Sequence, residues 1–304
     1  MTQYGYWRDT QPNNNRLVLR GFSNVNNVWY LAPQGGVGPL AGTKANTFTT
    51  FADLSPHLRS RDLVILFGVL REQAVAPLGV FDVTIVGGAD RPRQATDGGV
   101  PTGGGASWLA PTSPTAATPL IELRQQGWTF QNIQFAGPTD DACIKMHREE
   151  TATYPDASHL TLQGCRFTGG LIGLEDFGGA SNVLIENCSF EDLAGVGGGA
   201  IVVTNQGIAI PSRWMVRYNR FLPSVNGIVG AWVDSQFIYN QIYKQTTTTI
   251  NAASGNTGLR NMFMFNNFNI AAADFDPAGG VTGNATDQWL SYLTDAIEQG
   301  VPAN

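Results

Sequence analysis

Four side chains in this sequence have the types and spacing that acid–base catalysis would need: Arg124, His147, Glu175 and Asp176. They lie on or directly after short apolar segments, which read LIELR (120–124), CIKMH (143–147) and LIGLE (171–175). We align these segments with AIVVT (200–204) as neighbouring strands, using Ile121, Ile144, Ile172 and Ile201. Arg124, His147 and Glu175 then share one column, with Asp176 next to it. His147 could act as a general base, and either carboxylate as an acid or a Ca²⁺ ligand.

The same alignment supports a structural interpretation of these charges. It places Glu122 beside Lys145, and it alternates basic and acidic side chains from strand to strand. Opposite charges on adjacent strands in register stabilise a sheet as a cross-strand ladder. The alternation favours the ladder, and the active site remains the other interpretation.

Other catalytic and metal-binding patterns are weaker in this sequence. Glu122 with Glu175, or Glu175 with Glu186, could form the carboxylate pair of a glycosidase, but a chain with 24 acidic residues offers such pairs by chance. The sequence has no P-loop, dinucleotide fingerprint or Ser/His/Asp pattern. Its three cysteines, at 143, 165 and 188, lack metal-binding spacing, so we predict buried free thiols, no metal and no cofactor.

One eight-residue phrase recurs six times and must position these candidates. The copies are WTFQNIQF (128–135), LTLQGCRF (160–167), VLIENCSF (183–190), WMVRYNRF (214–221), SQFIYNQI (235–242) and NMFMFNNF (261–268). The third and eighth residues are always apolar, and successive copies are 32, 23, 31, 21 and 26 residues apart. Alternating apolar residues in a repeat of this length predict a solenoid, in which each coil buries its apolar face against its neighbours.

The phrases and the apolar segments between them resemble the right-handed parallel β-helix of pectate-lyase-like and phage tailspike proteins, over about residues 60–270. The resemblance implies an all-β fold, a right-handed parallel β-helix solenoid. It also implies that the short helix expected at residues 49–58 caps the first coil. The sixth phrase position contains Asn219, Asn240 and Asn266, which predicts a ladder of stacked asparagines inside the coils.

The fifth phrase position changes character along the chain. Its first three residues, Asn132, Gly164 and Asn187, suit a left-handed bend, whereas Tyr218, Tyr239 and Phe265 do not. We therefore expect a different bend in the last three coils and an outward aromatic stripe, which either contacts a subunit or glycan or is covered by a loop of the same chain. A carbohydrate groove would be lined by Trp232, Tyr239 and Tyr243.

The sequence divides into three parts. Residues 1–22 form a polar, aromatic arm whose Tyr4, Tyr6 and Trp7 are expected to make assembly contacts. Residues 23–270 form the predicted β-helix, with a long Pro- and Gly-rich loop at 89–118. Residues 271–304 are a linker followed by a C-terminal helix at 286–299, predicted from apolar residues on one stripe.

Composition restricts the possible partners. A net charge of −6 without a basic run argues against nucleic acid. The chain has no run of about 18 apolar residues, so we expect no membrane partner. It begins without a secretory signal, so we expect synthesis in the host cytoplasm and release in a particle.

These features predict a non-enzymatic structural protein of a tailed-phage virion, either a capsid decoration or a component of a tail spike or fibre. We expect it to form a homotrimer, to contact other virion proteins and to touch host-surface glycans. Two alternatives remain: a polysaccharide-degrading tailspike depolymerase or lyase, and a carbohydrate-binding module without catalysis.

Overall fold

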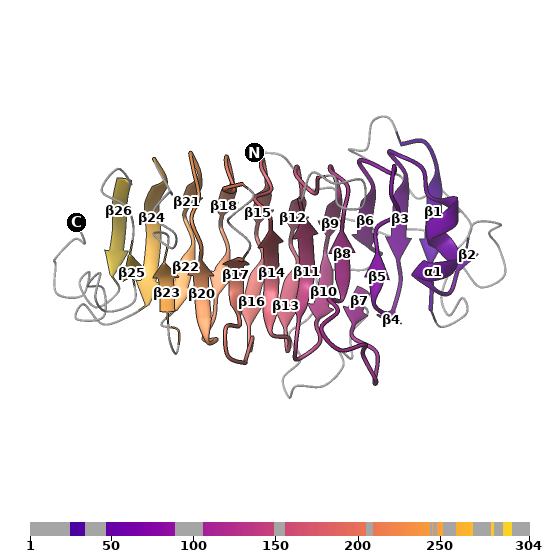
Figure 1. Ribbon diagram of the computed structural model, residues 1–304, viewed down its shortest axis with the longest axis horizontal. Helices are drawn as coiled ribbons and strands as arrows, with labels where there is room; N and C mark the ends of the chain where they lie inside the picture. The colour runs from indigo at the N-terminus through magenta and orange to yellow at the C-terminus, as the bar shows by residue number, and fades with distance from the viewer. Residues whose placement is uncertain are drawn as a thin grey trace, which may run out of the picture.

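The coils form one elongated stack in the computed structural model (Figure 1). It describes residues 25–33, 47–88, 106–148, 156–204, 209–243, 245, 248–251, 260–269, 281–282 and 288–293. Within these residues the strands form an 18-stranded and an eight-stranded sheet, and the strand pairings are parallel. The fold is therefore all-β, with long parallel sheets consistent with a β-helix solenoid.

The strands lie in three rows, which we call the first, second and third walls. The first wall contains β1 (Val28–Leu31), β3 (Leu63–Leu66), β6 (Thr84–Gly87), β9 (Thr129–Gln131), β12 (Thr161–Gln163), β15 (Leu184–Glu186), β18 (Met215–Arg217), β21 (Gln236–Ile238), β24 (Met262–Asn269) and β26 (Gln288–Leu293). The second contains β4 (Val69–Arg71), β7 (Ala106–Leu109), β10 (Ile133–Ala136), β13 (Arg166–Thr168), β16 (Ser189–Glu191), β19 (Arg220–Phe221) and β22 (Gln241–Tyr243). The third is the eight-stranded sheet of β5 (Ala74–Val75), β8 (Ile121–Leu123), β11 (Ala142–His147), β14 (Ile172–Phe177), β17 (Gly199–Val203), β20 (Asn226–Val229), β23 (Thr248–Asn251) and β25 (Val281–Thr282). The short β2 (Thr47–Phe48) pairs with β1.

Each of the first five phrases supplies one strand of the first wall and one of the second, and the sixth is a single strand, β24, that pairs with both walls. The apolar positions of the phrases face inward. The twelve side chains at the third and eighth positions are completely buried, as predicted: Phe130, Leu162, Ile185, Val216, Phe237, Phe263, Phe135, Phe167, Phe190, Phe221, Ile242 and Phe268. The ring of Phe190 is stacked between Phe167 and Phe221, with centroids 4.8 and 5.1 Å away. The core is thus a set of columns in which each coil covers the next.

The bend between the two phrase strands has the same backbone in every coil. The fifth-position residues have positive φ angles between 54° and 63°, and these include Tyr218, Tyr239 and Phe265. The prediction of a different bend at the aromatic residues is therefore wrong. The aromatic residues adopt this bend because the asparagine that follows each of them points inward, where hydrogen bonds to the neighbouring coils hold it.

The asparagine ladder is confirmed. Backbone N–H and Nδ2 of Asn219 both donate to Oδ1 of Asn240, at 3.0 Å each. The same two groups of Asn240 donate to Oδ1 of Asn266, at 2.9 and 3.0 Å. All three residues are buried, so their amides replace water as partners for the bend backbone.

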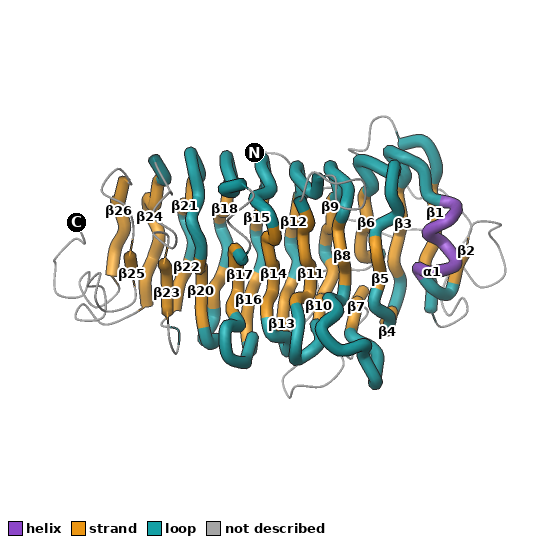
Figure 2. Tube along the Cα trace, in the orientation of Figure 1, coloured by secondary structure: helices purple, strands orange, loops and turns teal. Residues whose placement is uncertain are grey.

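A short helix lies beside β1 and β2 at the N-terminal end of the stack (Figures 1 and 2), where the sequence places the cap. It consists of α1 (Phe51–Leu54) followed by a 3-10 turn at Ser55–His57. Thr50 is the N-cap, and its hydroxyl accepts a hydrogen bond from Asp53 N–H at 3.1 Å. Phe51 and Leu54 are buried, and the Phe51 ring contacts Trp108 at 5.3 Å.

Two predicted segments are wrong in part. Residues Gln288–Leu293 form β26, which pairs in parallel with β24, and not a helix. This is a seventh copy of the phrase that is one residue shorter, with a register shift between Met264 and Asn267, so alignment without gaps did not find it. Residues Ala106–Leu109 of the predicted loop form β7, a buried strand. The arm with Tyr4, Tyr6 and Trp7 lies outside the described residues.

Candidate functional site

The four candidate catalytic residues come from β8, β11 and β14 of the third wall, but their register differs from the predicted one. Ile144 pairs with Ile121, as expected, whereas its other partner is Leu174 and not Ile172. Glu175 therefore lies beside Lys145, and His147 lies beside Phe177. A shift of two residues keeps every side chain on its own face of the strand, so alternation alone could not detect it.

Five outward-facing residues form what we call the charged ladder: Glu122, Arg124, Lys145, His147 and Glu175. Arg124 donates from Nε and from an Nη to the two oxygens of Glu122, at 3.0 Å each. His147 Nε2 lies 3.4 Å from Glu122 Oε1, and Lys145 Nζ lies 3.1 Å from Glu175 Oε2.

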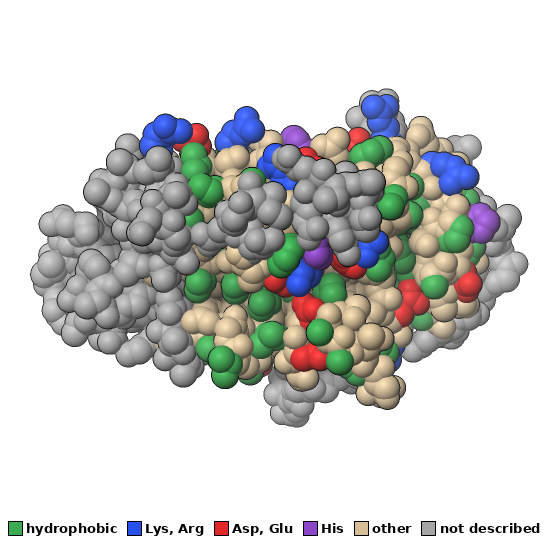
Figure 3. Space-filling model, in the orientation of Figure 1, with side chains coloured by type: hydrophobic (Ala, Val, Ile, Leu, Met, Phe, Trp, Pro, Cys, Tyr) green, Lys and Arg blue, Asp and Glu red, His purple; other side chains and the backbone are tan. Residues whose placement is uncertain are grey.

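The two acids and the histidine of the charged ladder are buried, Arg124 and Lys145 are partly exposed, and the carboxylates are satisfied. Glu122, His147 and Glu175 are each exposed by less than a tenth. The second oxygen of Glu175 accepts a hydrogen bond from the Thr204 hydroxyl at 2.7 Å. Lys145 also lies over the Phe177 ring, 5.1 Å from its centroid. Figure 3 shows charged side chains gathered over the middle coils, where Figure 1 places β11 and β14. Each acid thus has a fixed partner, as in a cross-strand ladder.

Asp176 is separate from the charged ladder, because it is completely buried in a row with Met146 and Val203. Both its oxygens accept a hydrogen bond from Ala180 N–H, at 3.0 and 3.1 Å. Burial raises the pKa of this carboxyl to about 7. The predicted role as an acid or Ca²⁺ ligand is wrong, since a substrate on the outer face does not reach this side chain.

We expect Asp176→Asn to flatten the dependence of stability on pH. The folded-state pKa of the Asp176 carboxyl is raised, so the native state binds the proton more tightly and loses stability as pH rises from about 4 to 7. Asparagine keeps an acceptor for Ala180 and does not ionise. The free energy of unfolding of the variant relative to the wild type should increase by on the order of 2–4 kcal/mol between pH 4 and 8.

Denaturant unfolding at several pH values measures this difference. Glu72 and Asp141, whose pKa values burial also raises, are present in both proteins, so the difference isolates Asp176. Parallel pH profiles for the two proteins would contradict the prediction.

The predicted carboxylate pairs differ in geometry. Glu122 and Glu175 both flank Lys145, from coils on either side of it, so their strands are about 10 Å apart. Glu186 belongs to the first wall, where it contacts an Arg217 nitrogen at 2.9 Å and accepts from Gln163 at 3.2 Å. Glu175 and Glu186 therefore lie on different sheets, and the second of the two predicted pairs is wrong.

The residues predicted to contact glycan or a subunit do not form one surface. Trp232 is completely buried against Trp214 and Phe237, so its predicted role in a groove is wrong. Tyr243 lies in the second wall, where its hydroxyl accepts a hydrogen bond from Gln241 at 2.9 Å. Tyr218, Tyr239 and Phe265 are exposed and stacked, as predicted, and we call them the aromatic stripe.

A second column of left-handed bends was missed by the sequence analysis. The residue before each of the six phrases, and the equivalent residue before β3 and β6, also has positive φ: Arg61, Asp82, Gly127, His159, Asn182, Arg213, Asp234 and Arg260. Gly, Asn, Asp and His are enriched in left-handed bends, whereas Arg61, Arg213 and Arg260 give no local signal for one. The available signal was their constant position directly before each phrase.

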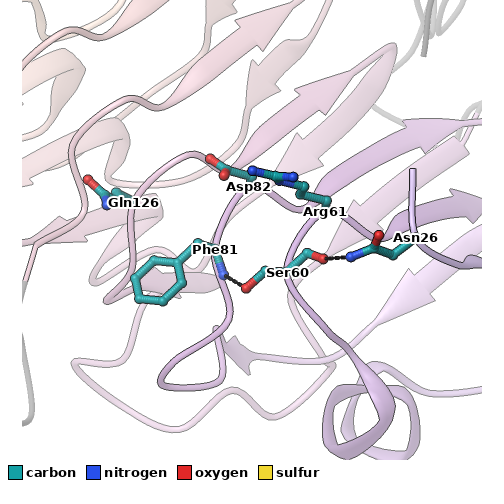
Figure 4. Close-up of a pocket in the computed structure, with 6 residues that line it drawn as sticks. All are labelled: Asn26, Ser60, Arg61, Phe81, Asp82 and Gln126. Atoms are coloured by element: carbon teal, nitrogen blue, oxygen red, sulfur yellow. Dashed lines mark hydrogen bonds between the residues drawn. The ribbon is translucent and has the colours of Figure 1, made fainter. Parts of the chain in front are cut away.

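This column borders a shallow hollow at the N-terminal end (Figure 4). It measures about 440 Å³ and is lined by Asn26, Ser60, Arg61, Phe81, Asp82 and Gln126. Asn26 Nδ2 donates to the Ser60 carbonyl at 2.7 Å, and Phe81 N–H donates to the Ser60 hydroxyl at 3.0 Å. The hollow is open to solvent.

The three cysteines are buried free thiols, as predicted. Burial raises the pKa of the Cys143 thiol to about 12, so it stays protonated and unreactive at neutral pH. Among the residues that the structure describes, no three His, Cys, Asp or Glu side chains are placed to hold a metal ion. In the same residues, no helix has the length and apolar character to cross a membrane.

The chain matches no protein-family model and no curated protein. The charged ladder, the aromatic stripe and the regularity of the coils are therefore the basis for a function.

Proposed function

We propose that this protein is a non-enzymatic structural protein of a tailed-phage virion, built as a right-handed parallel β-helix. The observation that carries the proposal is the charged ladder, in which both oxygens of Glu122 and of Glu175 already have partners inside the chain. A general acid or base must reach a substrate proton, and these groups are instead committed to each other and largely buried.

The right-handed path of the coils is supported by sheet geometry. Parallel strands joined by a crossover in one sheet are right-handed in about 98% of cases, because strands twist to the right. Among the described residues, the strands of each of the three walls pair in parallel with those of the neighbouring coil. The buried asparagine ladder and the constant bends support a rigid rod that resists unfolding in a particle.

The proposed location and partners follow from the resemblance to tailspike proteins. We propose a place on the capsid or in a tail spike or fibre, assembly as a homotrimer, contacts with other virion proteins through the arm, and contact with host-surface glycans. The exposed aromatic stripe supports assembly, since exposed contiguous apolar groups mark interaction sites.

Polysaccharide cleavage is the second candidate, and the placement of Glu122 and Glu175 favours it over other chemistry. Carboxylates about 6.5–9.5 Å apart suit an inverting glycosidase, and these two flank one lysine at a comparable separation. For such a reaction the Lys145–Glu175 ion pair would have to open, because it occupies one oxygen of the proposed base.

The proposal is tested by assaying wild type and Glu175→Gln for release of reducing ends from purified bacterial surface polysaccharides. We expect no release from either protein. Release by the wild type that Glu175→Gln abolishes would establish the enzyme instead. Quantitative mass spectrometry of density-purified particles of the encoding phage should find several copies per particle, and their absence would refute the virion role.

A further inference from the structure

The outer face of the first wall becomes more apolar from the middle coils to the last coils of the repeat. Its outward positions in the first coils are apolar but buried, as at Tyr30, Leu63, Ile65 and Val86. In the coils of β9 and β12 they are polar, at Thr129, Gln131, Thr161 and Gln163, and the two glutamines are hydrogen-bonded at 2.8 Å. The same positions in the last three coils of the repeat include Met215, Ile238, Met262 and Met264, all partly exposed. A solvated face needs no such change, and methionine is common at binding surfaces.

The aromatic stripe borders this apolar face along the fifth-position bends. Tyr218, Tyr239 and Phe265 are 50, 46 and 40% exposed, although each has a left-handed backbone that costs a bulky residue about 1 kcal/mol. Asn132 and Asn187 occupy the same bend in earlier coils, so the fold itself does not require aromatic residues there. The aromatic stripe thus combines a strained backbone with exposed rings, a combination that indicates a binding surface.

The orientation of the rings favours a protein partner over a glycan. Tyr239 is stacked on Tyr218 and on Phe265 at 5.3 and 5.0 Å, with interplanar angles of 11° and 13°. The guanidinium of Arg217 lies 6.0 Å from the centroid of the Tyr218 ring. Sugars stack on ring faces, and these faces are largely occupied within the stripe. The stripe presents ring edges, which are electropositive and attract carboxylates.

The opposite border of the same face carries charges in the same coils. Arg213, Asp234 and Arg260 are exposed and occupy the second column of bends. Two Arg260 nitrogens donate to the two oxygens of Asp234, at 2.7 and 2.9 Å. This hydrogen bonding and the Arg213 charge hold the pKa of Asp234 below its ordinary value.

We propose that this part of the first wall is a contact between parallel copies of the chain, in which the aromatic stripe of one copy packs against Arg213, Asp234 and Arg260 of the next. The proposal rests on the assembly role proposed above and names its surface. It is a heterologous contact, because the two borders differ, and repetition around an axis can close it into a ring.

The two borders match coil by coil. In each of these coils the charged residue comes five positions before the aromatic residue, at the other end of the same first-wall segment. Two parallel copies at equal height therefore bring the charged border of each coil against the aromatic border of the equivalent coil. Asp234 then meets Tyr239, whose hydroxyl can donate to it. Arg260, which pairs with Asp234, meets Phe265, a ring without a hydroxyl, and can pack its apolar stem against the ring edge. Antiparallel copies would instead place the charged border against itself.

The test replaces Tyr218, Tyr239 and Phe265 together by asparagine, the residue that earlier coils use at this bend. Light scattering on a size-exclusion column should give an oligomer for the wild type and a monomer for the triple variant. The variant should melt at the same or a higher temperature than the isolated wild-type subunit, since asparagine relieves the backbone strain. The matched control is Val75→Asn/Leu78→Asn, which removes two exposed apolar side chains elsewhere and should leave the oligomer intact.

A charge swap tests the second border. Asp234→Arg/Arg260→Asp preserves the ion pair within the chain. Across the contact, however, it places an arginine against Tyr239 and an aspartate against Phe265, so the dissociation constant of the oligomer should rise at least tenfold. An oligomer that survives the triple asparagine replacement would overturn this surface and leave the virion role intact. A wild-type chain that stays monomeric at high concentration would overturn self-contact altogether, whereas the virion role fails separately if particles lack the protein.

Discussion

Asn240→Ala is expected to lower the free energy of unfolding by about 3–6 kcal/mol. The Asn240 side chain accepts from two groups of Asn219 and donates to the Val216 carbonyl and to Asn266, at distances of 2.9 to 3.0 Å. Alanine leaves several of these groups buried without that partner, and each orphaned group costs about 1–3 kcal/mol. Chemical denaturation, followed by circular dichroism, measures the loss.

The matched control is Gln241→Ala, one residue further along the same coil. Gln241 lies on the second wall, is partly exposed and donates to the Tyr243 hydroxyl. Its loss should cost less than about 1 kcal/mol, as expected for a surface substitution. Equal losses for the two variants would show that the buried ladder contributes no more than a surface amide.

Phe190→Ala is expected to cost about 3–5 kcal/mol, because it empties the centre of a column. The Phe190 ring is parallel to its neighbours Phe167 and Phe221, within 6° and 2°. Coils on both sides would lose a stacking partner, and a rigid repeat is poorly able to collapse into the space. Thermal and denaturant unfolding of the variant measure the effect.

Two comparisons make this prediction specific. Phe190→Leu keeps much of the volume and should cost clearly less than the alanine variant. Phe81→Ala removes a ring that is 36% exposed and should cost less than about 1 kcal/mol. A loss at Phe190 no larger than that at Phe81 would refute the view that the phenylalanine columns hold the coils together.

The inward half of the fold was predictable because it depends on side-chain periodicity. The third and eighth phrase residues and the asparagines at the sixth position each follow directly from alternation and from their repeat. β26 was missed for a related reason: its Trp289, Leu290 and Leu293 fit a helical stripe as well as a strand, and its pairing with β24 skips a residue.

The outward features were less predictable, because they depend on register and on tertiary contacts. The two-residue shift that places Glu175 beside Lys145 leaves every face unchanged, so nothing in the alternation distinguishes it. The left-handed bends at Tyr218, Tyr239 and Arg260 contradict local preference and exist because the neighbouring coils impose them. Asp176 was grouped with the charged column as an acid or Ca²⁺ ligand, although it fills an inward position on β14.

The structural role of the charged ladder is tested most directly by the unfolding free energy of Glu175→Gln relative to wild type. The substitution keeps the shape of the side chain but removes the negative charge that faces Lys145. It also weakens the acceptor to which the Thr204 hydroxyl donates. A structural ladder predicts a loss of about 2 kcal/mol, because the largely buried Lys145 ammonium group loses its closer carboxylate and keeps only Asp141, at 3.9 Å. Unchanged or increased stability would contradict it, since residues kept for catalysis commonly stabilise a protein when they are replaced.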